Sequence, residues 1–448
     1  MHLLITGWAL VVLGVAFILF YLASEKGRVF DPICVSWIGF IVFIAVAMIL
    51  ASSSKETRVS EDVRSLTSFY TVLGALSYLI GLYAGKGLRI AYRMPAPAVA
   101  FTKIEIWAVW VISVIGFFLV SAAQQFTGGA VERMLEGITV GFIGSTALIS
   151  TYSILYLKRS LITKTVMLSA MVIVISIFIS LFFSKRPLIG IVIAVLGYLY
   201  AFKISKYSLK SRWIFLLLTL FAAILTQFYL GTTRGHRFHS AIKETPPIFS
   251  QKALDIELGG ITINYLAFEL GVEKVPSEYD YLNGAGIVPG FTFLIPRSLW
   301  PSKPVGTGYF ISQLWLGKEK PEWNLSPLPI GELYLNFGEI GIIVGLFLVG
   351  KFVRFFNSYM ILHRKNSIIW LAWFMIIPDF VGEWRGDFTS MTAQGFMRVA
   401  VFVSLMLIVS MARKAMHSRI SYKKAPWPLM RGNRPVIMHR QGRLSASK

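Results

Sequence analysis

Charged side chains are scarce in this chain of 448 residues. Asp, Glu, Lys and Arg together make up 15% of it, while 55% of the residues are hydrophobic and the mean hydropathy is +0.65. A soluble protein of this length needs far more charged surface to stay dispersed in water. The composition therefore excludes an ordinary soluble globular protein and predicts a polytopic membrane protein.

Metal-binding residues are also few. The single cysteine, Cys34, excludes an intrachain disulfide and a cysteine-based metal site. His236 and His239 have a spacing that could bind a metal, but no third ligand is obvious and the chain contains no Asp-x-Asp pair. The sequence thus favours no metal and no cofactor.

Apolar runs are abundant and long. Because a helix needs roughly 20 apolar residues to cross a bilayer, each run of that length predicts one transmembrane helix. About eleven such windows occur, and they predict an all-α fold. They fall near 3–23, 31–51, 67–85, 104–124, 137–157, 165–183, 187–203, 213–231, 331–350, 367–382 and 394–412.

The basic residues predict the topology. A net charge of +22 would suggest nucleic-acid binding in a soluble chain, but here Lys and Arg sit mostly in short loops between apolar runs. One set of alternate loops, with the tail, carries 27 of them and the opposite short loops carry 7. By the positive-inside rule the first set is cytoplasmic. We therefore expect no nucleic-acid partner, and an outer location for the amino terminus and for the only long loop.

This reading divides the chain into four parts. Residues 1–231 hold eight transmembrane helices, 232–330 form a large outer cap of short helices, and 331–412 hold three more transmembrane helices. The remaining part, 413–448, carries ten Lys or Arg and no Asp or Glu. We expect it to be a cytoplasmic tail near anionic lipid.

Basic residues also gather on the side predicted to be outer. They occur in "SKRPLIG" with Arg186, in "GTTRGHRFHS", in "PRSLWPSKP" and in "GEWRGDF". Arginine's planar fork suits phosphate oxygens, so several such residues near one loop could bind a highly charged anion. Snorkelling at a headgroup boundary is the alternative reading for any single arginine.

Carboxylates on the same side could act as a base. The candidates are Glu257, Glu269, Asp280, Glu332, Glu383 and Asp387. Glu332 is the sharpest, because an ionisable group at the entrance of a membrane helix needs a partner or water. The same carboxylate would also favour the dipole at a helix N-terminus without any catalytic role, and that alternative stays open.

Three separated motifs, "PRSLWPSKP", "GELYLNFGEIGI" and "RGDF", resemble the Wzy-type O-antigen polymerases, the oligosaccharide repeat unit polymerases of bacterial inner membranes. The resemblance implies a metal-independent lipid-phosphosugar glycosyltransferase with a GT-C-like architecture. Its donor and acceptor would be oligosaccharides on undecaprenyl pyrophosphate, joined on the periplasmic face. A chain-length regulator and a flippase are possible partners.

The resemblance and the chemistry together nominate site residues. Arg186, Arg234, Arg297 and Arg385 would share the pyrophosphate groups. Glu332 or Asp387 would orient or deprotonate the acceptor hydroxyl, and Trp300 or Trp323 could stack on a sugar. The predicted catalytic residues are Arg297, Glu332, Asp387 and Arg234; the predicted binding residues are Arg186, Arg237, His236, Trp300, Lys303 and Arg385.

Two other functions remain open. An O-antigen ligase shares the donor and the chemistry but delivers the glycan to a lipid A core. A lipid-linked oligosaccharide flippase or another transporter would be expected to have charges buried mid-membrane and two equivalent halves, and the sequence shows few such charges and no repeat.

Overall fold

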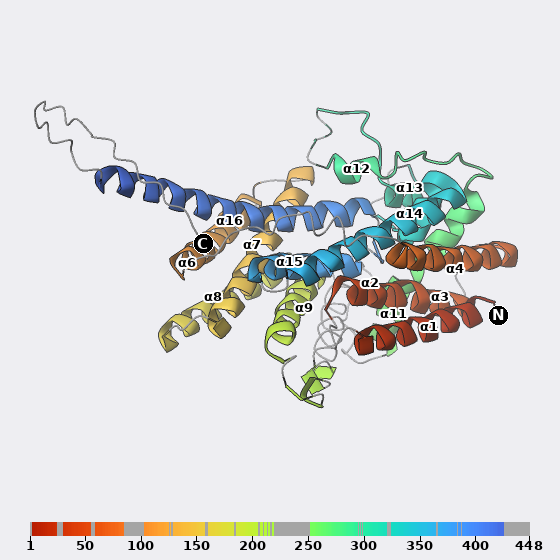
Figure 1. Cartoon of the computed structure of the whole chain (residues 1–448). Coiled ribbons are helices and arrows are strands. Elements are labelled where there is room, and N and C mark those ends of the chain that lie inside the picture. The colour runs from red at the N-terminus through yellow and green to blue at the C-terminus, as the bar shows by residue number, and fades with distance from the viewer. Residues whose placement is uncertain are drawn as a thin grey trace, which may run out of the picture.

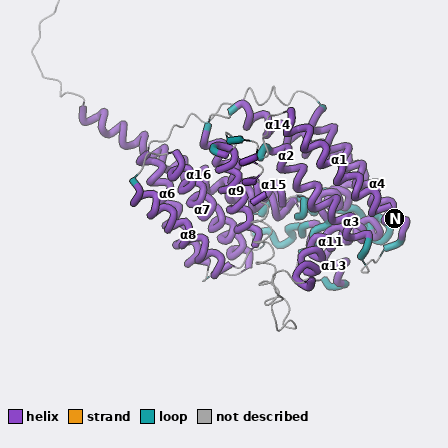
Figure 2. Tube along the Cα trace, turned by 90° about the horizontal axis from the view of Figure 1, so that it is seen from below, coloured by secondary structure: helices purple, strands orange, loops and turns teal. Residues whose placement is uncertain are grey.

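The structure of the chain is a computed structural model. It describes residues 2–24, 30–54, 59–84, 103–124, 126, 129–156, 160–182, 185–204, 251–293, 295, 297, 299–319, 324–363, 366–382, 384–386 and 388–424, with short pieces between 207 and 218. In these ranges the chain is helical and forms no strand, as the tube in Figure 2 shows. The predicted all-α fold is confirmed.

The helices follow one another along the whole described chain. They are α1 (His2–Ser24), α2 (Pro32–Phe40), the π-helix η1 (Ile41–Ala45), α3 (Val46–Ser52), α4 (Glu61–Tyr83), α6 (Lys103–Gln124), α7 (Gly129–Tyr156), α8 (Leu161–Phe182), α9 (Lys185–Phe202), α11 (Gln251–Lys274), α12 (Val288–Phe291), α13 (Thr307–Leu316), α14 (Leu328–Leu362), α15 (Ser367–Gly382) and α16 (Phe388–Lys424).

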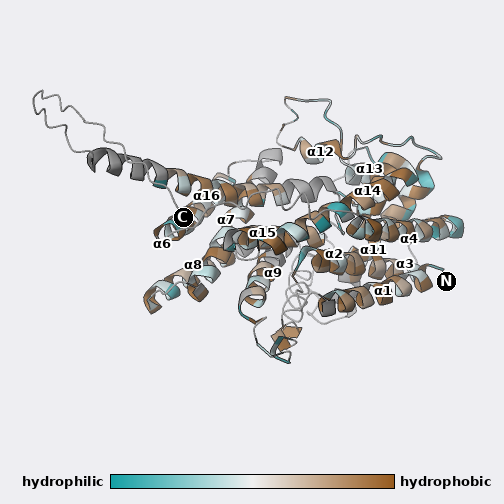
Figure 3. Cartoon of the chain, viewed as in Figure 1, coloured by the Kyte–Doolittle hydropathy of each residue, from teal (hydrophilic) through white to brown (hydrophobic). Residues whose placement is uncertain are grey.

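Seven of the helical stretches in the described part are long and apolar enough to cross a membrane. They correspond to seven of the eleven predicted windows, and three further windows correspond to shorter apolar helices: Leu161–Ile177, Ile191–Ala201 and Ile369–Gly382. Most of the window 213–231 lies outside the described residues. Apolar residues dominate these helices (Figure 3). A membrane-embedded helical protein is thus confirmed, while the count of eleven spans stays a prediction.

The helices form two neighbouring groups, visible on the two sides of Figure 1. In one group α1 to α4 pack with α11, α13 and α14, and in the other α6 to α9 pack with α16; α15 contacts members of both. Close backbone approach holds α4 against α14, because Gly81 touches the Phe347 carbonyl and Gly350 touches the Tyr78 carbonyl. Small residues at such crossings are how membrane helices pack tightly.

Two helices meet within α14 at Gly338. This residue has φ 65° and ψ −151°, a conformation that glycine adopts far more readily than other residues. The Tyr281 ring covers the break, so a side-chain carbon added to Gly338 would lie 3.2 Å from it. The window predicted at 331–350 therefore spans a kink, and Glu332 belongs to the segment before it.

The predicted outer cap contains one long helix. Its described part holds α11, α12 and α13, and α11 runs for 24 residues where only short helices were expected. α11 packs against α3, α4, α13 and α14, and it is not among the candidate membrane spans. This segment is thus built into the helical bundle, while the proposed boundaries at 231 and 330 stay predictions.

Candidate functional site

Residues of the second and third sequence motifs, and the helix that follows the first motif, contact α11. Arg385 Nη2 donates to the carbonyl of Gly260 on α11 at 3.2 Å. The start of α14 packs on the same helix, since a side-chain carbon on Gly331 would lie 2.8 Å from the Phe268 ring. On α13, which follows the first motif, Ile311 packs against Gly271. Segments far apart in the sequence therefore share one neighbour.

The loop of residues 292–304, which holds the first motif, is clamped by its own basic side chains. Arg297 Nη1 donates to the Lys303 carbonyl at 2.7 Å, and Nη2 donates to the Pro304 carbonyl at 3.1 Å. Lys303 Nζ in turn donates to the carbonyls of Thr292 at 2.6 Å and Ile295 at 3.1 Å. Both cations are therefore engaged with backbone oxygens.

The Trp300 side chain is also hydrogen-bonded within this loop. The Trp300 indole N–H donates to Ser302 Oγ at 3.1 Å. Partial burial and, second, the nearby Arg297 lower the pKa of Lys303 below its ordinary value. The geometry therefore gives Arg297, Lys303 and Trp300 a clear part in holding the 292–304 loop, which the sequence alone did not reveal.

The second motif joins the cap to α14. Asn336 Nδ2 donates to Thr307 Oγ1 at 3.0 Å and to the Glu332 carbonyl at 2.8 Å, while its Oδ1 accepts from the Gly286 N–H at 3.0 Å. The Tyr334 hydroxyl donates to the Val275 carbonyl at 2.8 Å. These bonds explain the polar residues of "GELYLNFGE" as anchors between the α14 start and the segment before it.

The two glutamates of this motif have different surroundings. Glu332 is buried, with 1% of its surface exposed. Glu339, just beyond the kink, is exposed, and its Oε1 accepts from the Tyr70 hydroxyl on α4 at 2.6 Å. The structure thus places the predicted catalytic Glu332 on the part of α14 that packs on α11, before the kink at Gly338.

Arg385 is half-buried in the bundle. Its guanidinium sits over the Phe43 ring, 5.9 Å from the centroid, and Phe43 is near the middle of the candidate span Pro32–Ser52. Neighbouring Trp384 donates from its indole N–H to Ser36 Oγ of α2 at 3.0 Å. The described residues 384–386 of the loop between α15 and α16 thus lie against α2 and η1, and the outer location of this loop stays a prediction.

Several predicted residues cannot be placed. Arg186 is in the first turn of α9, where only the backbone is described. Arg234, His236, Arg237, Trp323, Glu383 and Asp387 lie outside the described residues. Their assigned roles therefore stay predictions.

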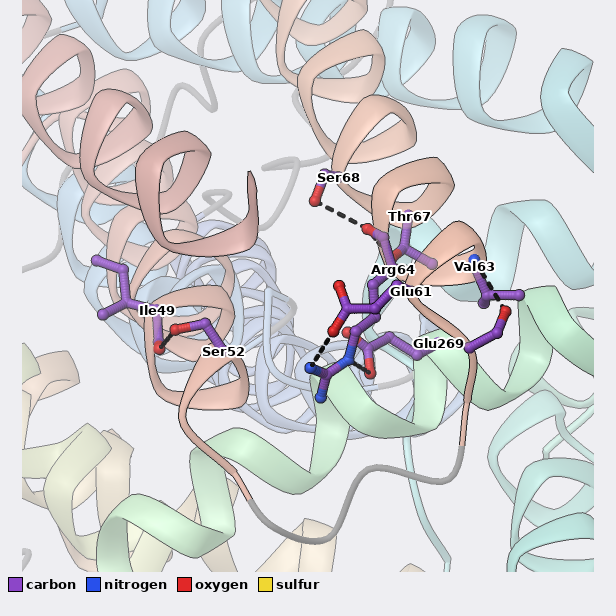
Figure 4. Close-up of polar contacts among 9 residues, drawn as sticks. Ile49, Ser52, Glu61, Val63, Arg64, Thr67, Ser68 and Glu269 are labelled. Carbon is purple, nitrogen blue, oxygen red and sulfur yellow. Dashed lines mark hydrogen bonds and ion pairs between the residues drawn. The ribbon is translucent and has the colours of Figure 1, made fainter. Parts of the chain in front are cut away.

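A second polar site, the Arg64–Glu269 cluster, joins α4 to α11 (Figure 4). Arg64 Nε lies 3.9 Å from Glu269 Oε2, and Arg64 Nη1 lies 3.6 Å from Glu61 Oε1. The Arg64 side chain is 11% exposed and that of Glu269 is 1% exposed, whereas Glu61 is 81% exposed. One guanidinium thus faces two carboxylates, of which one is buried.

Local structure fixes Arg64 in this position. Ser60 begins α4 and its Oγ accepts from the Val63 N–H at 3.4 Å, which satisfies a free donor of the first turn. Thr67 and Ser68 donate their hydroxyls to the Arg64 carbonyl at 3.0 and 2.9 Å. The helix therefore starts rigidly and points Arg64 towards α11.

Burial is the largest influence on the pKa of Glu269. It raises the pKa of Glu269 to about 7; Arg64 acts in the opposite direction and Glu61 adds a further rise. Sequence reasoning counted Glu269 among six carboxylates but missed Arg64. The available signal was a basic residue three positions after Glu61 in "SEDVRSLTS", at the start of an apolar helix.

Comparison with known proteins adds no identification. No protein-family model, no curated protein and no solved structure matches the chain. The functional reading therefore depends on the motifs, the fold and the geometry of the polar sites.

Proposed function

We propose that the chain is an integral-membrane glycosyltransferase that polymerises repeat units of a surface polysaccharide. The donor is a glycan on undecaprenyl pyrophosphate, and the acceptor is the non-reducing end of another lipid-linked repeat unit. The reaction takes place at the face of a bacterial inner membrane that the positive-inside rule makes periplasmic. This proposal follows the resemblance carried by the three motifs.

One observation carries the proposal beyond the resemblance. Residues of two motifs pack on α11, Arg385 through Gly260 and Gly331 through Phe268, and α13, which follows the first motif, packs there through Ile311. A common site requires segments that are far apart in the sequence to contact one element of the structure, here α11. The convergence supports a single transfer site on α11.

The chemistry assigns a role to each charged residue of that site. Arg385 carries a permanent positive charge that is half-buried among apolar helices, where charges are costly and usually functional. It would stabilise the pyrophosphate as it leaves. Glu332, on α14, which packs on α11, would orient the acceptor. The clamped Arg297 and Lys303 would shape the entrance rather than grip the phosphate directly.

Reconstitution tests the proposal. The purified protein in proteoliposomes receives only undecaprenyl-pyrophosphate-linked repeat units, and the products are separated by glycan length. We expect a ladder of longer glycans and free undecaprenyl pyrophosphate. Movement of the lipid across the bilayer without a ladder would favour a flippase, and transfer only after lipid A core is added would favour a ligase.

A further inference from the structure

The Arg64–Glu269 cluster lies outside the three motifs, yet it is built like a binding site. Both Glu269 oxygens are buried, as are Arg64 Nε and Nη2, and none of these atoms has a hydrogen-bond partner among the described residues. An unsatisfied buried polar group costs on the order of 1–3 kcal/mol, and more when it is charged. Two of these four atoms, Arg64 Nε and Glu269 Oε2, face each other at 3.9 Å, which is too long for a direct hydrogen bond and indicates a missing polar group.

The Glu269 carboxylate and the Arg64 guanidinium determine which kind of polar group can fit between them. A carboxylate only accepts hydrogen bonds and a guanidinium only donates them, whereas a hydroxyl does both. A hydroxyl oxygen at roughly 2.8 Å from each would bridge the gap with normal geometry. A phosphate would be repelled by Glu269, and an ammonium group by Arg64. The site therefore fits a hydroxyl group, which water or a sugar can supply.

We propose that Arg64 and Glu269 bind a hydroxyl of the acceptor glycan and that Glu269 removes its proton during transfer. The inference rests on the proposed function. The acceptor oxygen forms a bond to the anomeric carbon of the donor, and the bond from that carbon to the pyrophosphate oxygen breaks. The pyrophosphate leaves with the electron pair, while the proton passes to Glu269 and then to water.

The charges around Glu269 suit this role. α4 presents Arg64 and Glu61, α11 presents Tyr265 one turn away, and on α14 Glu332 follows the Gly331 that packs on Phe268. With Glu269 ionised, the two carboxylates that pair with Arg64, those of Glu61 and Glu269, outweigh its single positive charge, and one proton on Glu269 restores the balance between these three groups. A base whose pKa is near 7 can both accept and release a proton at neutral pH.

Exposure gives the direction of approach. It rises from Glu269 at 1% to Arg64 at 11% and Glu61 at 81%, so the path from solvent runs past Glu61 and Arg64. An acceptor that enters this way meets the guanidinium first and then the carboxylate. Arg64 would thus position the hydroxyl before Glu269 takes the proton.

The first test measures chain extension in proteoliposomes as a function of pH. We expect the wild-type rate to rise through about pH 7, and Glu269→Gln to lower it at least 100-fold and to remove that rise. Glu269→Asp should restore part of the rate. Glu105→Gln is the matched control, because Glu105 is also buried and pairs with an arginine, Arg413, at 3.4 Å.

Arg64→Lys gives a second measurement if Glu269→Gln does not insert stably. It should raise the KM for acceptor several-fold and leave the KM for donor unchanged. A stably inserted Glu269→Gln protein with the wild-type rate and pH profile would overturn the inference and leave the polymerase proposal standing. A wild-type protein that makes no ladder at any pH would overturn both.

An infrared titration tests the proton site without relying on activity. The difference between wild type and Glu269→Gln should show one carboxyl group that loses its proton near pH 7. A Glu269 that is still ionised at pH 5 would be an ordinary salt bridge, and the proposed base would be wrong.

Discussion

Two charged regions of this protein use their arginines in opposite ways. In the 292–304 loop, Arg297 and Lys303 direct their donors at four backbone carbonyls of the same loop. In the Arg64–Glu269 cluster, the guanidinium faces carboxylates at 3.6 and 3.9 Å and keeps buried donors without hydrogen bonds to described residues. Arg297 and Lys303, which stand out in the sequence, thus stabilise their own loop, whereas Arg64, which does not stand out, keeps donors that a ligand could use.

Of the changes that test this difference between the two regions, Arg64→Ala should have the largest effect on stability. It leaves Glu269 buried without its cation, and breaking such a pair typically costs about 3–5 kcal/mol. We expect a strong loss of thermal stability at pH 8, measured in detergent, and a smaller loss at pH 5, where Glu269 is protonated. The double variant Arg64→Ala, Glu269→Gln should recover much of the loss. Simple addition of the two single effects would show that the groups do not interact.

The free energy of unfolding of the wild-type protein should depend on pH because of Glu269. Its pKa is raised from 4.5 to about 7 on folding, so the folded state binds the proton more tightly. The stabilising contribution is complete below pH 4.5 and is lost as pH rises through 7, a change of up to about 3 kcal/mol. Glu269→Gln should flatten this part of the stability curve relative to Glu105→Gln, and an unchanged slope would assign it to other groups.

Arg385→Lys tests the half-buried guanidinium. Lysine keeps the charge but loses the planar fork and the stacking on Phe43. If Arg385 stabilises the leaving pyrophosphate, kcat for chain extension should fall roughly 100-fold while the amount of inserted protein stays close to normal. Arg413→Lys, between α16 and α6, is the matched control. An equal fall in the control would indicate a general packing defect.

Arg297→Lys should have the smallest effect of the four. A single ammonium cannot reproduce the two bonds to the Lys303 and Pro304 carbonyls, so the loop should loosen and become more sensitive to proteolysis. Chain extension should fall only a few-fold. Loss of activity with an unchanged proteolytic cleavage pattern would indicate that Arg297 binds phosphate directly. The difference drawn between the 292–304 loop and the Arg64–Glu269 cluster would then be wrong.

The sequence predicted the helical class well because hydropathy along the chain reports the bilayer requirement directly. Ten of the eleven windows correspond to apolar helices in the described part, seven of them long enough to span. Glu332 was singled out from its place before an apolar run, and the structure shows that it is buried on α14. Its catalytic role stays a prediction.

Other features could not be read from sequence patterns. The break at Gly338 depends on the Tyr281 ring above it, and the partial burial of Arg385 depends on a short α15 beside α2. Arg64 lies in a segment with charges of both signs, and only packing of α4 on α11 distinguishes it from the other residues there. Long-range contacts of this kind leave no local signature.

A structure of the protein in lipid with an undecaprenyl-pyrophosphate-linked repeat unit bound tests the central claim most directly. We predict a sugar hydroxyl within hydrogen-bond distance of both Arg64 and Glu269, with Arg297 still bonded to the carbonyls of Lys303 and Pro304. A closed direct ion pair between Arg64 and Glu269, together with phosphate oxygens on Arg297, would contradict the account.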